Sequence, residues 1–244
     1  MKQTIRASAL YFALLLAAAL PFGAMSNAAM AAGQASADAQ PGAANMPQTV
    51  DAFRQQGYAV RSISPIFGQL FMFSFPQGFQ TVFENTRGDH YIREAVLAGE
   101  NENKWTQMVT VTGIRDLSAN PNVTPKIFAQ GMAGGFKRAC PASFSAVSVM
   151  DGDISGHDAF AAVVSCGTSP ASNGTTSEAA LILVIKGDHD YYTLQWAERG
   201  TPSATPVAID GKKWSDKFAR LAPVKLCPIV PGEAAPYASC AGSK

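Results

Sequence analysis

Short apolar stretches bounded by turn-forming residues run through most of the chain after its first 68 residues. Side chains within them alternate as strands do: in Trp105–Thr112, Met108 faces one way and Val109 and Val111 face the other. Glycine, aspartate, asparagine, serine and proline separate the stretches. The pattern predicts strands at Gln69–Phe75, Phe79–Asn85, His90–Leu97, Trp105–Thr112, Phe144–Met150, Asp158–Cys166, Glu178–Lys186 and Tyr191–Glu198.

Helical spacing of apolar residues occurs in three other places. We expect a short helix at Thr49–Gln56, a helix that begins at Pro125 and runs through Lys137, and a last helix at Gly211–Leu221. Thr124 is suited to cap the second helix, and a proline in the first turn misses no hydrogen bond. Strands clustered between helices, with links short enough for hairpins, predict the α+β class: one antiparallel β-sheet covered by helices.

The first residues have the three parts of a secretory signal peptide. Lys2 and Arg6 provide a positive start, Leu10–Leu20 is an apolar run, and small residues follow up to Ala31. A membrane anchor is the alternative, but a bilayer span needs roughly 20 apolar residues. We therefore expect cleavage after Ala31 or, alternatively, Ala28, which leaves no stable membrane span and places the protein in the periplasm or outside the cell.

Composition divides the rest of the chain into a leader and a domain. Residues 32–46 are rich in alanine, glycine, glutamine and serine without an apolar period, which predicts a flexible leader. Residues 47–244 are enough for a single α+β domain. Removing 1–31 takes away Lys2 and Arg6 and no acidic residue, so the formal net charge of +1 falls by two. A nearly neutral chain without basic clusters argues against nucleic acid as a partner.

The chain has four cysteines: Cys140, Cys166, Cys227 and Cys240. An even number in an exported chain predicts two disulfides, for which three connectivities exist. We favour Cys140–Cys166 and Cys227–Cys240, the second of which closes a short, proline-rich C-terminal tail. No two cysteines have the close spacing of zinc ligands.

Several groups of residues offer chemistry, and each has a simpler interpretation. Asp151-Gly152-Asp153-Ile154-Ser155-Gly156 is similar to the start of a calcium loop, but Ala162 occupies the place of the final carboxylate, so we interpret the segment as a turn. His90, His157 and His189 each adjoin an aspartate in an expected turn, and the sequence does not show that they converge.

The remaining catalytic patterns are also weak. Glu94, Glu100 and Glu102 have the residue types of an acid–base pair, yet we interpret them as a solvated strand end and turn. No serine or cysteine stands in a nucleophile motif, and no glycine-rich loop is built to hold phosphate. We therefore expect no catalytic residues, no metal site and no cofactor.

One segment has a recognisable order of features. It contains Pro76-x-Gly78-Phe79, Glu94-Ala95-Val96, Gly99-Glu100, Trp105-Thr106-x-Met108, a helix after Pro125 and a cysteine-bearing strand. Over Phe71–Leu226 this order resembles the PsbP/Mog1/DcrB-like family of small exported bacterial proteins, many of unknown function. The resemblance implies an antiparallel sheet between helical layers and a role in binding or assembly. It brings no active site, and this chain lacks the lipid-attachment cysteine of the lipoprotein members.

The sequence thus favours an exported, non-enzymatic binding or assembly module of the bacterial envelope, with another protein or an envelope component as its partner. Glu94, Glu100 and Trp105 are the candidate binding surface. A metal-dependent or hydrolytic periplasmic enzyme that uses the His/Asp turns is one alternative, and an envelope-stress or host-interaction factor is another. The sequence does not indicate an oligomeric state.

Overall fold

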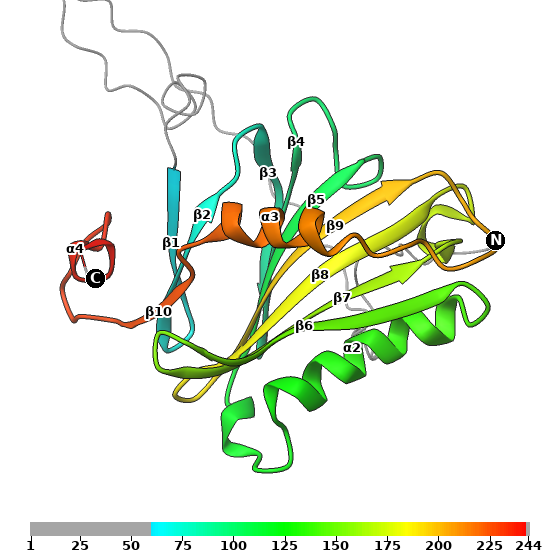
Figure 1. Ribbon diagram of the computed structural model, residues 1–244. Coiled ribbons are helices and arrows are strands. Elements are labelled where there is room, and N and C mark those ends of the chain that lie inside the picture. Colours follow the sequence, from blue (N-terminus) through cyan, green and yellow to red (C-terminus); the bar gives the residue numbers. More distant parts are fainter. Residues whose placement is uncertain (1–59, 243–244) are drawn as a thin grey trace, which may run out of the picture.

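A computed structural model describes residues 60–242 of the chain (Figure 1). The expected signal peptide, leader and helix at Thr49–Gln56 lie outside this range. The strands are β1 (Val60–Ile66), β2 (Gln69–Phe75), β3 (Phe79–Arg87), β4 (His90–Leu97), β5 (Gln107–Ile114), β6 (Phe144–Ile154), β7 (His157–Cys166), β8 (Ser177–Lys186), β9 (Tyr191–Gly200) and β10 (Lys225–Pro228). The helices are α2 (Pro125–Ala139), α3 (Gly211–Leu221) and α4 (Ala238–Ala241), with short 3-10 turns at Leu117–Ala119 and Pro170–Ser172.

Seven strands form one large antiparallel sheet in the order β3-β4-β5-β9-β8-β7-β6. Hairpins connect β3 to β4, β6 to β7 and β8 to β9, while β5 pairs with β9 at the centre. The predicted α+β class with an antiparallel sheet is confirmed. Among the described strands, β3 and β6 are the two edges of this sheet.

The prediction of a single sheet is wrong, because β2 belongs to a second antiparallel sheet with the order β1-β2-β10. Both faces of β2 are buried, which explains its place. Phe71 and Phe73 join the main core, while Leu70 and Met72 pack against the C-terminal disulfide. A strand that is apolar on both faces is stabilised by lying between two layers rather than along one edge.

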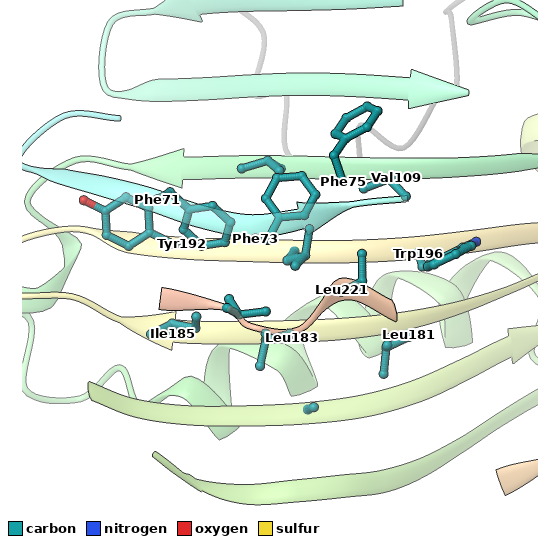
Figure 2. Packing of buried hydrophobic residues seen from close by; sticks show 14 of the residues in the cluster. Phe71, Phe73, Phe75, Val109, Leu181, Leu183, Ile185, Tyr192, Trp196 and Leu221 are labelled. Atoms are coloured by element: carbon teal, nitrogen blue, oxygen red, sulfur yellow. The ribbon is translucent and has the colours of Figure 1, made fainter. Parts of the chain in front are cut away.

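The main core fills the space between the two sheets (Figure 2). Phenylalanines of β2 meet Tyr192 of β9, whose ring stacks on Phe71 at 5.9 Å between centroids. Aliphatic residues of β8 lie alongside, and Leu221 of α3 closes the same face. The predicted alternation in β5 is confirmed, since Val109 and Val111 enter this core and Met108 lies on the opposite face.

The two long helices cover opposite faces of the large sheet. Helix α3 lies on the core side, and α2 packs under β6, β7 and β8 on the other side. The backbone N–H of Ile127 donates to the Thr124 hydroxyl at 3.2 Å, so the predicted cap is confirmed. Among residues 60–242, no helix is long and apolar enough to cross a membrane.

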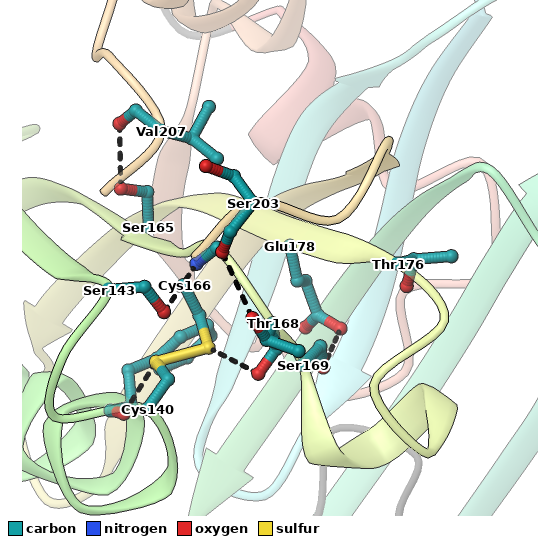
Figure 3. Close-up of a disulfide and its surroundings, with 12 residues drawn as sticks. Cys140, Ser143, Ser165, Cys166, Thr168, Ser169, Thr176, Glu178, Ser203 and Val207 are labelled. Atoms are coloured by element: carbon teal, nitrogen blue, oxygen red, sulfur yellow. Dashed lines mark hydrogen bonds between the residues drawn. A yellow bond between two sulfur atoms is a disulfide. The ribbon is translucent and has the colours of Figure 1, made fainter. Parts of the chain in front are cut away.

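Two disulfides are present, and they join the pairs that the sequence favours. Cys140–Cys166 connects the end of α2 to the end of β7 (Figure 3). Beside it, the backbone N–H of Gly167 donates to the Ser143 hydroxyl at 3.1 Å. Cys227–Cys240 attaches α4 to β10, two elements that the sequence pattern did not predict.

Candidate functional site

Glu94 of β4 is buried, with 4% of its surface exposed, so its interpretation as a solvated strand end is wrong. It lies opposite Thr110 of β5, on the face that does not join the main core. Its Oε1 atom has no hydrogen-bond partner among the described residues. Burial, helped by the negative charge of Glu102, raises the pKa of Glu94 to about 7.

Trp105 is also buried, under the guanidinium group of Arg199, which lies 3.7 Å from the ring centroid. The Arg199 Nε atom is 3.4 Å from Glu178 Oε2, which also accepts a hydrogen bond from Ser169 at 3.2 Å. Burial raises the pKa of Glu178 although Arg199 opposes the shift. The indole N–H of Trp105 has no partner within residues 60–242. Trp105 therefore anchors its loop on Arg199 rather than facing solvent.

Glu100 serves the same loop. Its carboxylate accepts hydrogen bonds from the backbone N–H of Thr106 at 2.9 Å and from the Thr106 hydroxyl at 2.6 Å. The structure brings Glu94 near Glu102, while Glu100 turns to Thr106. Glu94, Glu100 and Trp105 thus do not form one exposed surface, and a binding role for them stays a prediction.

The histidines lie in turns or at strand ends with different neighbours. His90 is 2.6 Å from Asp89, and His157 is 3.8 Å from Asp188 and 3.5 Å from Gln69. Within the described part of the chain, no three His, Cys, Asp or Glu residues are placed to hold a metal ion. The calcium-like segment forms the end of β6 and the turn to β7.

Sequence reasoning missed a charged network between β9 and α3. The Glu198 carboxylate accepts from Lys217 at 2.7 Å and also from Lys213. Burial acts to raise the pKa of Glu198, but these two hydrogen bonds outweigh it and the pKa is lowered. Lys217 is buried as well, and its Nζ also donates to Gln107 at 3.0 Å. Lys213 and Lys217 stand at the i, i+4 spacing of one helix face, which is the only sign of this network in the sequence.

Strand β6 carries two of the exposed large apolar side chains within residues 60–242; the others are Phe83, Ile127, Ile229 and Val230. Val147 and Val149 are 50% and 47% exposed, and Ile127 in the first turn of α2 is 51% exposed. Lys126 holds that turn to β6 through Asp151, at 3.2 Å. Within residues 60–242, β6 pairs with β7 on one side only. We call Phe144–Met150, with its free side, the β6 edge.

The β6 edge has no charged residue, no proline and no glycine. Unpaired N–H and C=O groups on such an edge are a template for another strand, and proteins that avoid this pairing place charges or proline there. The bulge between Ser148 and Met150 shortens the regular part of the edge to Phe144–Ser148. Five regular residues are nevertheless enough to accept a strand of ordinary length.

Comparison with known proteins gives structural similarity only. No protein-family model matches the chain, and no curated protein matches it in sequence. A crystal structure of the Ran-binding protein Mog1p of Saccharomyces cerevisiae is similar at 9% identity and a TM-score of 0.37, over 68% of this chain and 86% of that one. A point mutant of Mog1 is similar at 8% identity and a TM-score of 0.38, over 67% of this chain and 86% of that one. These similarities concern the fold alone.

Proposed function

We propose that this protein is an exported, non-enzymatic binding module that engages a protein partner through the β6 edge. The observation that carries the proposal is an uncharged edge strand with half-exposed valines on a well-packed sheet, whose second side pairs with no other strand among residues 60–242. Export is supported by the signal-like residues 1–31 and by the two disulfides, which persist in oxidising compartments.

Strand addition explains how this edge would provide affinity. The backbone of a docked strand makes main-chain hydrogen bonds to the free side of β6, and its side chains cover the exposed valines. Full burial of a valine contributes about 1.5–3 kcal/mol, so Val147, already half covered, has about 1 kcal/mol left to contribute. Affinity then depends on several such contacts, which is typical of reversible binding.

The rigid support beneath the edge makes it suitable for recognition. Helix α2 packs under β6, β7 and β8, and Cys140–Cys166 ties the end of that helix to β7. A preformed strand loses little conformational entropy when a partner docks. The edge therefore offers a fixed template instead of a segment that must fold on binding.

Site-specific photo-crosslinking in the producing cell tests this function. A photoreactive amino acid at position 147 should give a discrete protein adduct, whereas the same group at Thr81 on β3 should give none. The captured protein, identified by mass spectrometry and purified, should bind the wild type and the Thr81→Lys variant equally. It should bind Val147→Lys about tenfold or more weakly, because a lysine opposes strand pairing at an edge. No adduct at 147, or equal adducts at both positions, would contradict the proposal.

A further inference from the structure

We infer that the partner of the β6 edge is a second copy of this chain, docked antiparallel so that the two large sheets join through β6. The inference rests on the proposed function and names its partner. It comes from the way charge is distributed along the edge. The apolar centre is neutral, while its two ends carry opposite charge.

One end of the edge is acidic. Asp151 and Asp153 follow the uncharged part of β6, and Asp158 is the second residue of β7. Asp153 lies directly opposite Asp158 in the hairpin register. Like charges in that position destabilise a pair of strands, so a nearby cation would relieve a repulsion that is already present. Of these three carboxylates, Lys126 forms an ion pair with Asp151 alone, at 3.2 Å and on the exposed surface.

The other end of the edge is basic. Helix α2 ends with Lys137 and Arg138, just before the chain turns into β6 at Phe144. Both side chains are exposed, and neither forms an ion pair with a carboxylate among residues 60–242. The pair also complements the partial negative charge at the helix C-terminus. The basic end is therefore free to meet an acidic group from outside the chain.

A two-fold axis brings these ends together. If β6 pairs with its copy antiparallel about Ala146, Phe144 faces Ser148 of the other copy and Ser145 faces its Val147. Beyond the bulge, Asp151 and Asp153 lie toward the end of the contact at which α2 of the other copy ends with Lys137 and Arg138. A two-fold contact is self-complementary, so each attraction occurs twice. A parallel arrangement would instead place acidic ends together and basic ends together.

The regular pairing is only five residues long, so we expect a reversible dimer. Specific stable interfaces bury about 1,200–2,000 Å² in total, and a five-residue strand pair is a small contact by that standard. Ile127 is half exposed and follows Lys126, which pairs with Asp151 next to the edge, so it is available to add apolar surface to the contact. The dimer should therefore form in a concentration-dependent way.

Sedimentation equilibrium of the purified, oxidised chain tests the inference. The wild type should approach twice the monomer mass as its concentration rises from micromolar to millimolar. Val147→Lys should weaken the dimer about tenfold or more, and Thr81→Lys on β3 should leave it unchanged. A wild type that stays monomeric, or a Val147→Lys dimer as strong as the wild type, would overturn the inference. Thermal melts identify any variant that fails to fold.

A charge exchange provides the sharper test. Asp153→Lys alone and Arg138→Glu alone should each weaken the dimer by about threefold, as expected for exposed ion pairs, and the double variant should recover the loss. Failure of the double variant to recover would contradict the antiparallel arrangement. An adduct at position 147 that contains another protein and none of this chain would overturn self-association while leaving the proposed function in place.

Discussion

The two edges of the large sheet are solvated to a similar degree but differ in chemistry. Strand β3 is exposed along most of its length, yet it carries Glu84 and Arg87 and has a bulge after Thr81. Strand β6 is equally exposed and has no charge from Phe144 to Met150. Charges and bulges prevent unwanted strand pairing. On β3 the bulge and the charge of Glu84 are neighbours, although Phe83 beside them is 39% exposed, whereas on β6 the charges of Asp151 and Asp153 lie only at one end, beyond the bulge.

The halves of the sheet behind these edges differ too. On the side away from the main core, the β6 half packs alanine, valine and isoleucine against α2 and is stapled by Cys140–Cys166. On the same side, the β3 half buries Glu94, and one oxygen of its carboxylate has no hydrogen-bond partner within residues 60–242. The β6 half is thus stabilised by apolar packing and a disulfide, whereas the β3 half contains a buried carboxyl group that lowers stability.

The largest loss of unfolding free energy should come from removing the disulfide of the β6 half, because this disulfide contributes to the difference in stability between the two halves. Replacing Cys140 and Cys166 together by alanine opens a link across 26 residues, which the loop-entropy estimate puts at about 3.5 kcal/mol of unfolding free energy. The matched control replaces Cys227 and Cys240, whose separation of 13 residues corresponds to about 3 kcal/mol. Urea unfolding measures both, and a larger loss for the C-terminal pair would contradict this order.

The unfolding free energy should depend on pH through Glu94, which lies in the β3 half. The folded-state pKa is raised to about 7 from 4.5, so the folded protein holds this proton more tightly than the unfolded chain does. Its contribution to stability is therefore present at low pH and is lost as the pH rises from 4.5 through 7. Glu94→Gln should raise the free energy of unfolding at pH 8 by up to about 3 kcal/mol, and much less at pH 4.5.

Denaturant titrations at the two pH values check this prediction. Asp216→Asn, an exposed carboxylate on α3, is the control and should show little difference between them. An equal effect of Glu94→Gln at both pH values would show that the Glu94 side chain is not held protonated by its surroundings.

The smallest effect should come from the cap of α2, which supports the β6 half. Thr124→Ala removes the acceptor for the Ile127 N–H and should cost about 1 kcal/mol of unfolding free energy. Thr124→Ser keeps the hydroxyl and should retain most of the stability. Chemical denaturation of the wild type and the two variants measures the unfolding free energy. Equal losses for the alanine and serine variants would show that the hydroxyl does not stabilise the helix.

Local patterns in the sequence predicted most elements of this fold. The ranges of β2, β4 and α3 agree with the sequence expectation at both ends. Strand β1 was missed because Arg61, two serines and Pro65 hide its apolar residues, and β10 was missed because it has only four residues. Strand periodicity is a local property, whereas the choice between one sheet and two depends on packing between distant segments.

The candidate site was harder to predict for the same reason. Alternation in β4 puts Glu94 on the face opposite Tyr91, but nothing in that pattern says whether the face is covered. The sequence around Val147 likewise does not indicate that its strand lies at an edge, because edge position follows from the order of all seven strands. Alternation within a strand predicts the face on which each side chain lies. The residues that it contacts there are known only once the whole sheet is assembled.

The setting of Trp196 makes this molecule convenient to follow spectroscopically. Its ring lies in the core with the Lys217 ammonium 4.1 Å and the Arg220 guanidinium 4.8 Å from its centroid, both contributed by α3. Its indole N–H donates to Gln107 at 3.0 Å. Two cations near an indole produce a strong local electric field, and their contribution to that field is lost if α3 leaves the sheet. In a variant that keeps Trp196 and replaces Trp105 and Trp214, intrinsic fluorescence therefore reports the docking of α3 on the sheet.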